Sequence, residues 1–269
     1  MATQLIMARS PEEAVSSLKG SAALLAGGTE VNRLGSEAAS GAETLISLKK
    51  CEGLREIEDA GDTVRIGSMC TFQQIIESDL TPEYLKEAAH FMASRTKRNM
   101  ATIGGNIGAL RCDSYLLPVL FAVCARVEVL TADGEKDICV NSFMEDTEAG
   151  EQMLIKTVIV PKNVRVASKR YSNTAQSHAV LTMSAAVTDK CVTLAAAVRN
   201  SGLYRFRNFE KHLSETREIS EEETMKWFED NLDIAMEDDM FGSVSYKRYL
   251  IGYTAFDLCR QVAGSGKEV

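Results

Sequence analysis

The hydrophobic positions of this chain follow two periods, and each period occupies its own stretches of sequence. Short apolar runs that end at glycine, proline or other turn residues predict β-strands. The pair at 55–58 and 63–68, joined by Ala60-Gly61-Asp62, predicts a β-hairpin. The other predicted strands are 22–26, 44–48, 126–131, 135–140, 153–160, 164–172, 180–187 and 191–199.

Helices are predicted from capping residues and from apolar positions spaced by three and four. Residues 10–13 (Ser-Pro-Glu-Glu) form a capping box with proline at the first helical position, so a helix should run to about Lys19. Residues 94–109 follow neither period and are predicted to form a loop. The other predicted helices begin at Thr71, at Thr81 and at the second capping box, 220–223, and cover 113–124 and 246–262.

Composition and charge narrow the function classes. The chain has 269 residues, 45% of them hydrophobic, so it can bury a large core in one or two domains. Its 30 basic and 38 acidic side chains give a net charge of −8 without a basic stripe, which argues against nucleic-acid binding. The apolar runs at 116–125 and 194–198 are shorter than the ~20 residues of a membrane span, and residues 1–9 do not resemble a secretory signal. We therefore expect a cytoplasmic protein without a membrane span.

Cysteines and histidines do not indicate a metal or catalytic site. The seven cysteines are odd in number and never stand as Cys-x-x-Cys, which argues against disulfides and iron–sulfur ligands; we expect buried, reduced thiols. His90, His178 and His212 have no partner at metal or triad spacing. We predict no catalytic residue and no metal ligand.

Two glycine loops are the best indication of function. One is Gly27-Gly28 within 24–31, and the other is Gly104-Gly105 within 101–108. A glycine pair can adopt positive φ and bring successive N–H groups close to phosphate oxygens. Neither fits Gly-x-Gly-x-x-Gly, so the doubly wound dinucleotide fold is not indicated. Taken alone, Gly27-Gly28 is better explained as a tight turn, while for Gly104-Gly105 the two explanations are equally good.

Side chains beside the loops could also contact a bound phosphate. Thr29 and Thr102 have hydroxyls able to donate to phosphate, and Asn106 can offer its amide. The alternative role of all three is to cap the loops, and the two roles are compatible. Thr29 is also predicted to begin a helical segment whose first N–H groups face the ligand. Arg95, Lys97 and Arg98 form a small basic cluster beside the second loop. Arg95 and Lys97 are best explained as a solvated turn, with electrostatic help to a diphosphate as a minor alternative.

Together and in this order, the loops resemble the phosphate-binding segments of the FAD-binding subunit of molybdenum hydroxylases, the family of xanthine dehydrogenase and carbon monoxide dehydrogenase medium chains. The first family segment reads approximately Ala-Gly-Gly-Thr-Asp/Glu, as in 26–30, and the second reads Arg-Asn-x-Ala-Thr-Ile-Gly-Gly-Asn-Ile, matched in 98–107. Residues 64–71 resemble the family's Ile-Gly-Ala-x-Thr-Thr stretch, and 243–250 its closing Tyr-Arg-Arg helix. The resemblance is close over 1–163 and looser beyond.

The resemblance implies an α+β fold. A two-subdomain FAD-binding domain of the PCMH type would occupy 1–163, with subdomains of about 1–50 and 51–163. A smaller α+β domain of antiparallel strands and helices would occupy 164–269. FAD would bind non-covalently, and no histidine stands beside the first loop for covalent attachment.

The implied function is electron transfer within a heteromeric complex. The chain would be the FAD subunit of a xanthine dehydrogenase-type molybdenum hydroxylase, beside a molybdopterin-binding subunit. Electrons would arrive from a separate 2Fe–2S subunit and leave through FAD to NAD⁺ or another acceptor. The lack of an acid–base constellation suits this role, because a flavin supplies the redox chemistry itself.

The resemblance also implies which residues contact FAD. Lys169 falls where the family has a lysine near the flavin, and Ile155 at a position that packs against the cofactor. Tyr115 stands where many members carry an aspartate, and Asp113, two residues earlier, could make that contact if the loop is shaped differently. The implied cofactor-binding residues are Leu24, Leu25, Ala26, Gly27, Gly28, Thr29, Glu30, Val31, Thr102, Ile103, Gly104, Gly105, Asn106, Asp113, Ile155 and Lys169.

Two alternatives stay open at this stage. An assembly or scaffold subunit could keep the fold with weakened or lost FAD binding, and Tyr115 is the best support for it. A stand-alone flavin oxidoreductase is disfavoured, because no acid or base for a substrate is apparent.

Overall fold

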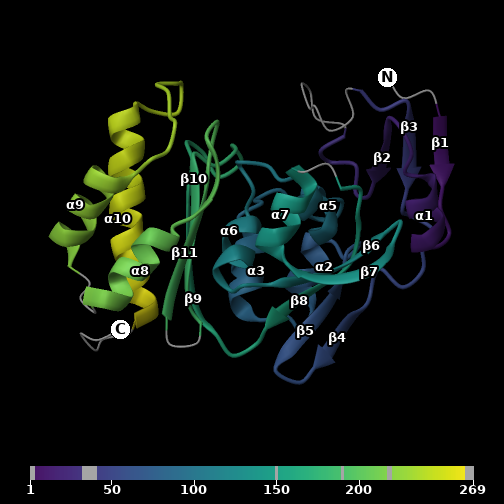
Figure 1. The fold of residues 1–269 in the computed structure, drawn as a ribbon, viewed down its shortest axis with the longest axis horizontal. Coiled ribbons are helices and arrows are strands. Elements are labelled where there is room, and N and C mark those ends of the chain that lie inside the picture. Colours follow the sequence, from purple (N-terminus) through teal and green to yellow (C-terminus); the bar gives the residue numbers. More distant parts are fainter. Residues whose placement is uncertain (1–3, 32–40, 149–150, 189–190, 217–219, 264–269) are drawn as a thin grey trace. The chain divides into compact units, whose positions relative to one another are not determined.

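The computed structural model describes residues 4–31, 41–148, 151–188, 191–216 and 220–263. The chain forms two compact units (Figure 1). The first consists of Met1–Leu110 and Cys124–Lys162, and the second of Arg111–Val123 and Asn163–Val269. The predicted assignment of 1–163 and 164–269 to two domains stays a prediction. Residues 111–123, which follow the second glycine loop, belong to the second compact unit.

A small parallel sheet opens the first unit. Its strand order is β1-β3-β2, with β1 (Gln4–Met7), β2 (Ala22–Leu25) and β3 (Thr44–Ser47). Helix α1 (Pro11–Ser17) starts as the capping box predicts, since Ser10 accepts from Glu13 N and Glu13 Oε2 accepts from Arg9 N. Strand β1 has no counterpart among the predicted strands.

A five-stranded antiparallel sheet makes up most of the first unit. Its order is β4-β5-β8-β6-β7. The predicted hairpin is present, but its first strand lies two residues later than the apolar pattern indicates. The strands are β4 (Ile57–Ala60), β5 (Thr63–Gly67), β6 (Arg126–Thr131), β7 (Gly134–Cys139) and β8 (Leu154–Pro161).

The helices of the first unit include three that the hydrophobic pattern does not predict. Residues 94–109, expected to be a loop, contain α4 and α5, and α7 lies in a stretch with no predicted element. Helix α2 follows the cap at Thr71, whose hydroxyl accepts from Gln74 N. The helices are α2 (Phe72–Glu77), α3 (Glu83–His90), α4 (Arg95–Arg98), α5 (Ile103–Gly108) and α7 (Val140–Glu148).

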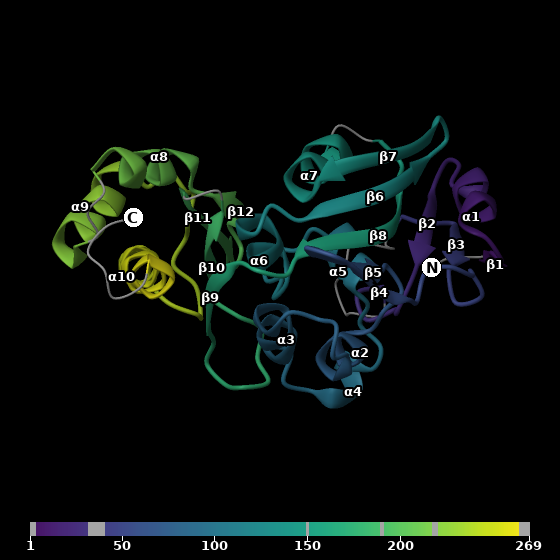
Figure 2. The ribbon, with the colours of Figure 1, turned by 90° about the horizontal axis from the view of Figure 1, so that it is seen from below.

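The second unit is a four-stranded antiparallel sheet with helices on both faces (Figure 2). Helices α8, α9 and α10 lie on one side of the sheet and α6 on the other, as both ribbon views show. The strand order is β12-β11-β10-β9, so one strand more than the three predicted is present. The elements are α6 (Leu117–Ala122), β9 (Arg165–Tyr171), β10 (Leu181–Thr188), β11 (Cys191–Val198), β12 (Gly202–Arg205), α8 (Arg207–Thr216), α9 (Glu221–Asn231) and α10 (Val244–Ala263).

Each unit has a core of its own. In the second unit, both central strands are buried on both faces, which explains why they consist of apolar and small residues and lack charged ones. Helix α10 contributes residues from Leu250 to Val262 to this core. In the first unit, Leu154 of β8 joins a cluster with residues of α1 and β3. Both glycine loops are built on the first unit.

Candidate FAD-binding site

The first glycine loop follows the carboxyl end of β2. Leu24 and Leu25 are the last strand residues, and the chain then leaves the sheet. Gly28 has φ +75°, a backbone conformation that favours glycine. Residues 29–31 form a turn, and the predicted helical continuation falls on 32–40, outside the described residues.

The first loop presents backbone donors to its surroundings. Residues 26–31 are all half-buried. Within the described ranges, the N–H groups of Gly27 and Thr29 and the Thr29 hydroxyl do not donate to any acceptor. Gly28 and Glu30 have polar contacts of their own. Half-buried donors of this kind can be satisfied by a bound anion, as expected of a phosphate-binding loop.

The second glycine segment is a short capped helix whose donors are already used. Thr102 caps α5, and its hydroxyl accepts from Gly105 N at 3.1 Å. Asn106 N donates to Thr102 O at 2.9 Å, Gly104 N to the carbonyl of residue 68 at 2.9 Å, and Ile103 N to that of residue 70 at 3.0 Å. These four amides therefore do not form the concave N–H nest that the glycine pattern predicts.

Glycine allows the two loops to touch. A methyl group on Gly27 would lie 1.8 Å from the carbonyl oxygen of Met100, which precedes the second segment. A methyl on Gly105 would lie 2.8 Å from Thr102 Oγ1 and 3.4 Å from the Cβ of Ala26. Since real Cβ contacts below 3.0 Å essentially never occur, a side chain at Gly27 would separate the loops, and a side chain at Gly105 would displace the Thr102 hydroxyl. The two predicted segments thus lie against each other in the first unit.

Gly104 has a different reason to be glycine. Its missing methyl group would lie 2.5 Å from the Cβ of Ser68, just after β5. The Ser68 hydroxyl is buried and has no hydrogen-bond partner in the described part of the chain. The lack of a side chain at Gly104 therefore allows α5 to pack against Ser68, at the end of the five-stranded sheet.

Arg98, one of the basic residues beside the second loop, has a structural role. It is only 9% exposed, and its guanidinium donates to Gln73 Oε1 at 2.9 Å and to the carbonyls of Met92 and Ala93 at 2.7 and 2.9 Å. Arg95 is exposed and pairs with Glu77 at 3.2 Å. The buried guanidinium of Arg98 therefore holds in place the chain that leads into the second loop.

Ile155 lies inside the five-stranded sheet. It is 6% exposed and faces Val129 across the β6–β8 ladder, next to a shift in register. Helix α5 packs on the same strand, β8. Its predicted packing against the cofactor stays a prediction.

Asp113, in the second unit, is engaged by two basic side chains. It is 6% exposed; Arg111 Nε lies 3.0 Å from its Oδ1, and His178 Nδ1 lies 3.1 Å from its Oδ2. His178 therefore has a carboxylate partner in the fold. The fold brings these residues together from segments far apart in the chain, so no sequence pattern could reveal the pair.

Tyr115, at the position of the family aspartate, is also covered by a cation. It is 9% exposed, and Arg170 Cζ lies 5.4 Å from its ring centroid, a cation–π distance. Arg170 also donates to Ser177 O in the loop that carries His178. The segment 113–115 is therefore held at His178, in the connection between β9 and β10, and at Arg170 of β9.

Lys169 is paired within the second unit. Its ammonium donates to Asp257 of α10, which is only 7% exposed, and this hydrogen bond raises the pKa of Lys169. Asp257 also accepts from Gln261 at 2.8 Å. The ammonium that the family resemblance places near the flavin is therefore paired with a carboxylate of the same unit.

Metal ligands and membrane spans are not found among the residues described. In those ranges, no three or more His, Cys, Asp or Glu side chains are grouped as they would be around a metal ion, and the cysteines are free thiols. Within the same ranges, no helix has both the length and the apolar character needed to cross a bilayer.

The first unit fits the diphosphate of FAD. Two loops meet in van der Waals contact only because glycine stands at the junction, and the first loop offers two backbone N–H groups and one hydroxyl that lack acceptors among the described residues. Phosphate oxygens are strong acceptors for such groups. The donor set is therefore that of an anion site, supplied mainly by backbone.

Comparisons with known proteins agree with this chemistry. A family model described as the FAD-binding domain in molybdopterin dehydrogenase matches residues 1–163. The uncharacterized protein YgfM of Escherichia coli K12 is 30% identical over 226 residues, covering 83% of this chain and 82% of that protein. The xanthine dehydrogenase FAD-binding subunit of E. coli O157:H7 is 34% identical over 128 residues, covering 45% of this chain and 43% of the subunit.

The fold has solved counterparts. A chain of carbon monoxide dehydrogenase from Hydrogenophaga pseudoflava superimposes with a TM-score of 0.82 at 19% identity, covering 98% of both chains. The predicted α+β fold class and family resemblance are confirmed. Together with the family match over the first 163 residues, these findings show that the chain belongs to the FAD-binding domain family of molybdopterin dehydrogenases, as an oxidoreductase flavoprotein subunit whose cofactor is FAD.

Proposed function

We propose that this chain passes electrons from a 2Fe–2S subunit to NAD⁺ or another acceptor through non-covalently bound FAD. The complex would also contain a molybdopterin-binding subunit and reside in the cytoplasm. FAD, when bound, supplies the redox chemistry. The observation that carries the proposal is the pair of touching glycine loops with unused donors on the first of them.

The residues of the chain would divide the work of binding. Gly27 and Thr29 would donate backbone N–H groups, and the Thr29 hydroxyl a further hydrogen bond, to the diphosphate. Helix α5 would act as a rigid wall, since its first amides are satisfied inside the protein. Asp113 and Lys169 already have partners, so a contact with FAD would compete with Arg111 and His178 for the former and with Asp257 for the latter.

Hydrogen exchange tests this division directly. Without FAD, we expect the amides of residues 103–106 to be protected and those of Gly27 and Thr29 to exchange fast. Saturating FAD should protect Gly27 and Thr29 and change 103–106 little. Protection that appears in the second segment alone would contradict the proposed roles.

Binding and partnership need separate measurements. The purified chain should show flavin absorption bands, and FAD at a hundred times its Kd should stabilise the fold by about 2.7 kcal/mol. Failure of both would favour a scaffold subunit that has lost the cofactor. Co-purification of the tagged chain with a chain that shows 2Fe–2S absorption bands tests the electron donor. Reduction of the bound flavin in that complex, followed by reoxidation with NAD⁺, tests the acceptor.

Substitutions in the loops provide a sharper test of the proposed FAD site. Gly28→Val forces a branched residue into a left-handed conformation, and Gly105→Val places methyl groups against Thr102 and Ala26. Both should weaken FAD binding at least about tenfold, or about 1.4 kcal/mol. Unchanged FAD affinity in both variants would contradict the proposed site.

A further inference from the structure

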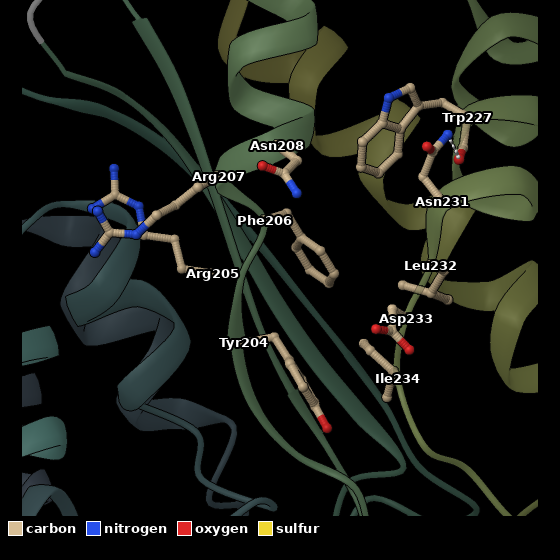
Figure 3. A pocket seen from close by; sticks show the side chains of 10 residues that line it. All are labelled: Tyr204, Arg205, Phe206, Arg207, Asn208, Trp227, Asn231, Leu232, Asp233 and Ile234. Atoms are coloured by element: carbon tan, nitrogen blue, oxygen red, sulfur yellow. Dashed lines mark hydrogen bonds between the residues drawn. The ribbon is translucent and has the colours of Figure 1, made fainter.

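A hollow of about 360 Å³ lies in the second unit, where β12 leads into α8 and where α9 ends (Figure 3). None of the residues implied in FAD binding lines it. Its size falls within the range of small-molecule sites. The lining residues are Tyr204, Arg205, Phe206, Arg207, Asn208, Trp227, Asn231, Leu232, Asp233 and Ile234.

The walls are aromatic and apolar. Phe206, Leu232 and Ile234 are each less than a tenth exposed, so they form a fixed floor. Trp227 is half-buried and held in place by Phe209 and Phe228, with ring centroids 5.0 and 5.1 Å away.

The polar groups on the wall that follows α9 are acceptors. Asp233 is exposed, lies on the same wall as Leu232 and Ile234 in Figure 3, and has no ion-pair partner within the described ranges. Asn231 donates its Nδ2 to Trp227 O at 2.9 Å, which leaves its Oδ1 as an acceptor. This wall therefore offers a carboxylate and an amide oxygen.

The two arginines of the hollow do not cancel this character. The guanidinium of Arg205 is engaged by Glu210, with Nε–Oε1 at 3.0 Å and an Nη2–Oε2 distance of 3.2 Å. In Figure 3 the guanidinium groups of Arg205 and Arg207 both point away from Trp227. The wall formed by residues 231–234 is thus rich in acceptors.

We propose that this hollow binds a small organic cation, an alkylammonium or alkylguanidinium with a short apolar stem. The stem packs on Phe206, Leu232 and Ile234. The charged head pairs with Asp233, which lies beside Ile234 in Figure 3. Binding here is separate from FAD binding, because no residue is shared between the two sites.

Trp227 is the only tryptophan of the chain, so its fluorescence reports on the hollow directly. Titration of the purified protein with n-butylguanidinium should give a saturable change in that fluorescence. The neutral pentanamide and the anionic pentanoate have stems of similar length and should give no saturable change at the same concentrations. Asp233→Asn should weaken n-butylguanidinium binding about tenfold, through loss of one charge-assisted hydrogen bond.

Asp230→Asn is the matched control. Asp230 is also exposed at the end of α9 but does not line the hollow, so its removal changes the net charge equally. Its affinity for n-butylguanidinium should equal that of the unmodified protein. A linear, non-saturable response, equal binding of pentanoate, or equal effects of Asp233→Asn and Asp230→Asn would each overturn the proposal. Far-UV circular dichroism of both variants verifies that they are folded.

Discussion

Replacing Gly27 by alanine tests whether the two loops meet as described. The added methyl group would lie 1.8 Å from the carbonyl oxygen and 2.8 Å from the carbonyl carbon of Met100. Both are backbone atoms, so no side-chain rotation can relieve the clash. Overpacking costs about 1–3 kcal/mol, and a backbone clash belongs at the upper end. A loss of about 3 kcal/mol corresponds to a melting temperature lower by roughly 6–12 °C.

Gly41→Ala provides the control. Gly41 lies in the same unit, and a methyl group there would meet no atom within 4 Å, so its melting temperature should stay within about 1 °C. Thermal unfolding of both variants without FAD measures the packing effect, and FAD titration measures its consequence for binding. If Gly27→Ala has the same melting temperature as Gly41→Ala and binds FAD normally, the loops do not touch at Gly27 and the reasoning is refuted.

Other substitutions test the supporting contacts. Arg98→Ala removes a buried guanidinium from three acceptors and should cost about 2–3 kcal/mol in urea unfolding; an effect below 0.5 kcal/mol would refute its bracing role. Burial raises the pKa of the Cys70 thiol to about 11, so stability should fall as pH rises from about 8.5, where the unfolded thiol ionises, toward 11, and a Cys70→Ala variant should lack this part of the pH dependence. At pH 8, iodoacetamide should modify the exposed Cys191 and spare Cys70, as read by peptide mass spectrometry. Asp257→Asn should return the pKa of Lys169 toward its ordinary value and cost at most about 1 kcal/mol, because the ammonium is partly exposed; a larger loss in thermal unfolding would mean that Asp257 has a further role.

The sequence allowed most of the regular elements to be predicted, because strands and capped helices have local signals. The capping box at 10–13 and the hairpin before Gly67 are examples. Helix α5 has no such signal: three of its six residues are glycine, which disfavours a helix. It forms because Thr102 caps it and because tertiary acceptors at residues 68 and 70 take its first amides.

The candidate site, like the fold, could be predicted only in part from the sequence. Glycine and threonine at spaced positions were enough to identify both loops, since their chemistry is local. The Asp113–His178 and Lys169–Asp257 pairs join residues from distant segments, and no periodicity or motif marks them in advance. Contacts of this kind follow from tertiary packing alone, so the sequence could name Asp113 and Lys169 but not their partners.

The same dipeptide has a different physical role in each loop. In the first loop, Gly28 takes a left-handed conformation and Gly27 makes room for a neighbouring backbone, leaving donors for a ligand. In the second segment, Gly104 and Gly105 make room for Ser68 and Thr102, and their N–H groups already donate to acceptors inside the protein. A substitution at Gly104 would therefore abolish FAD binding by moving α5, even if that residue never touches the cofactor. Loss of binding in such a variant identifies a contact only when the stability of the FAD-free protein is unchanged.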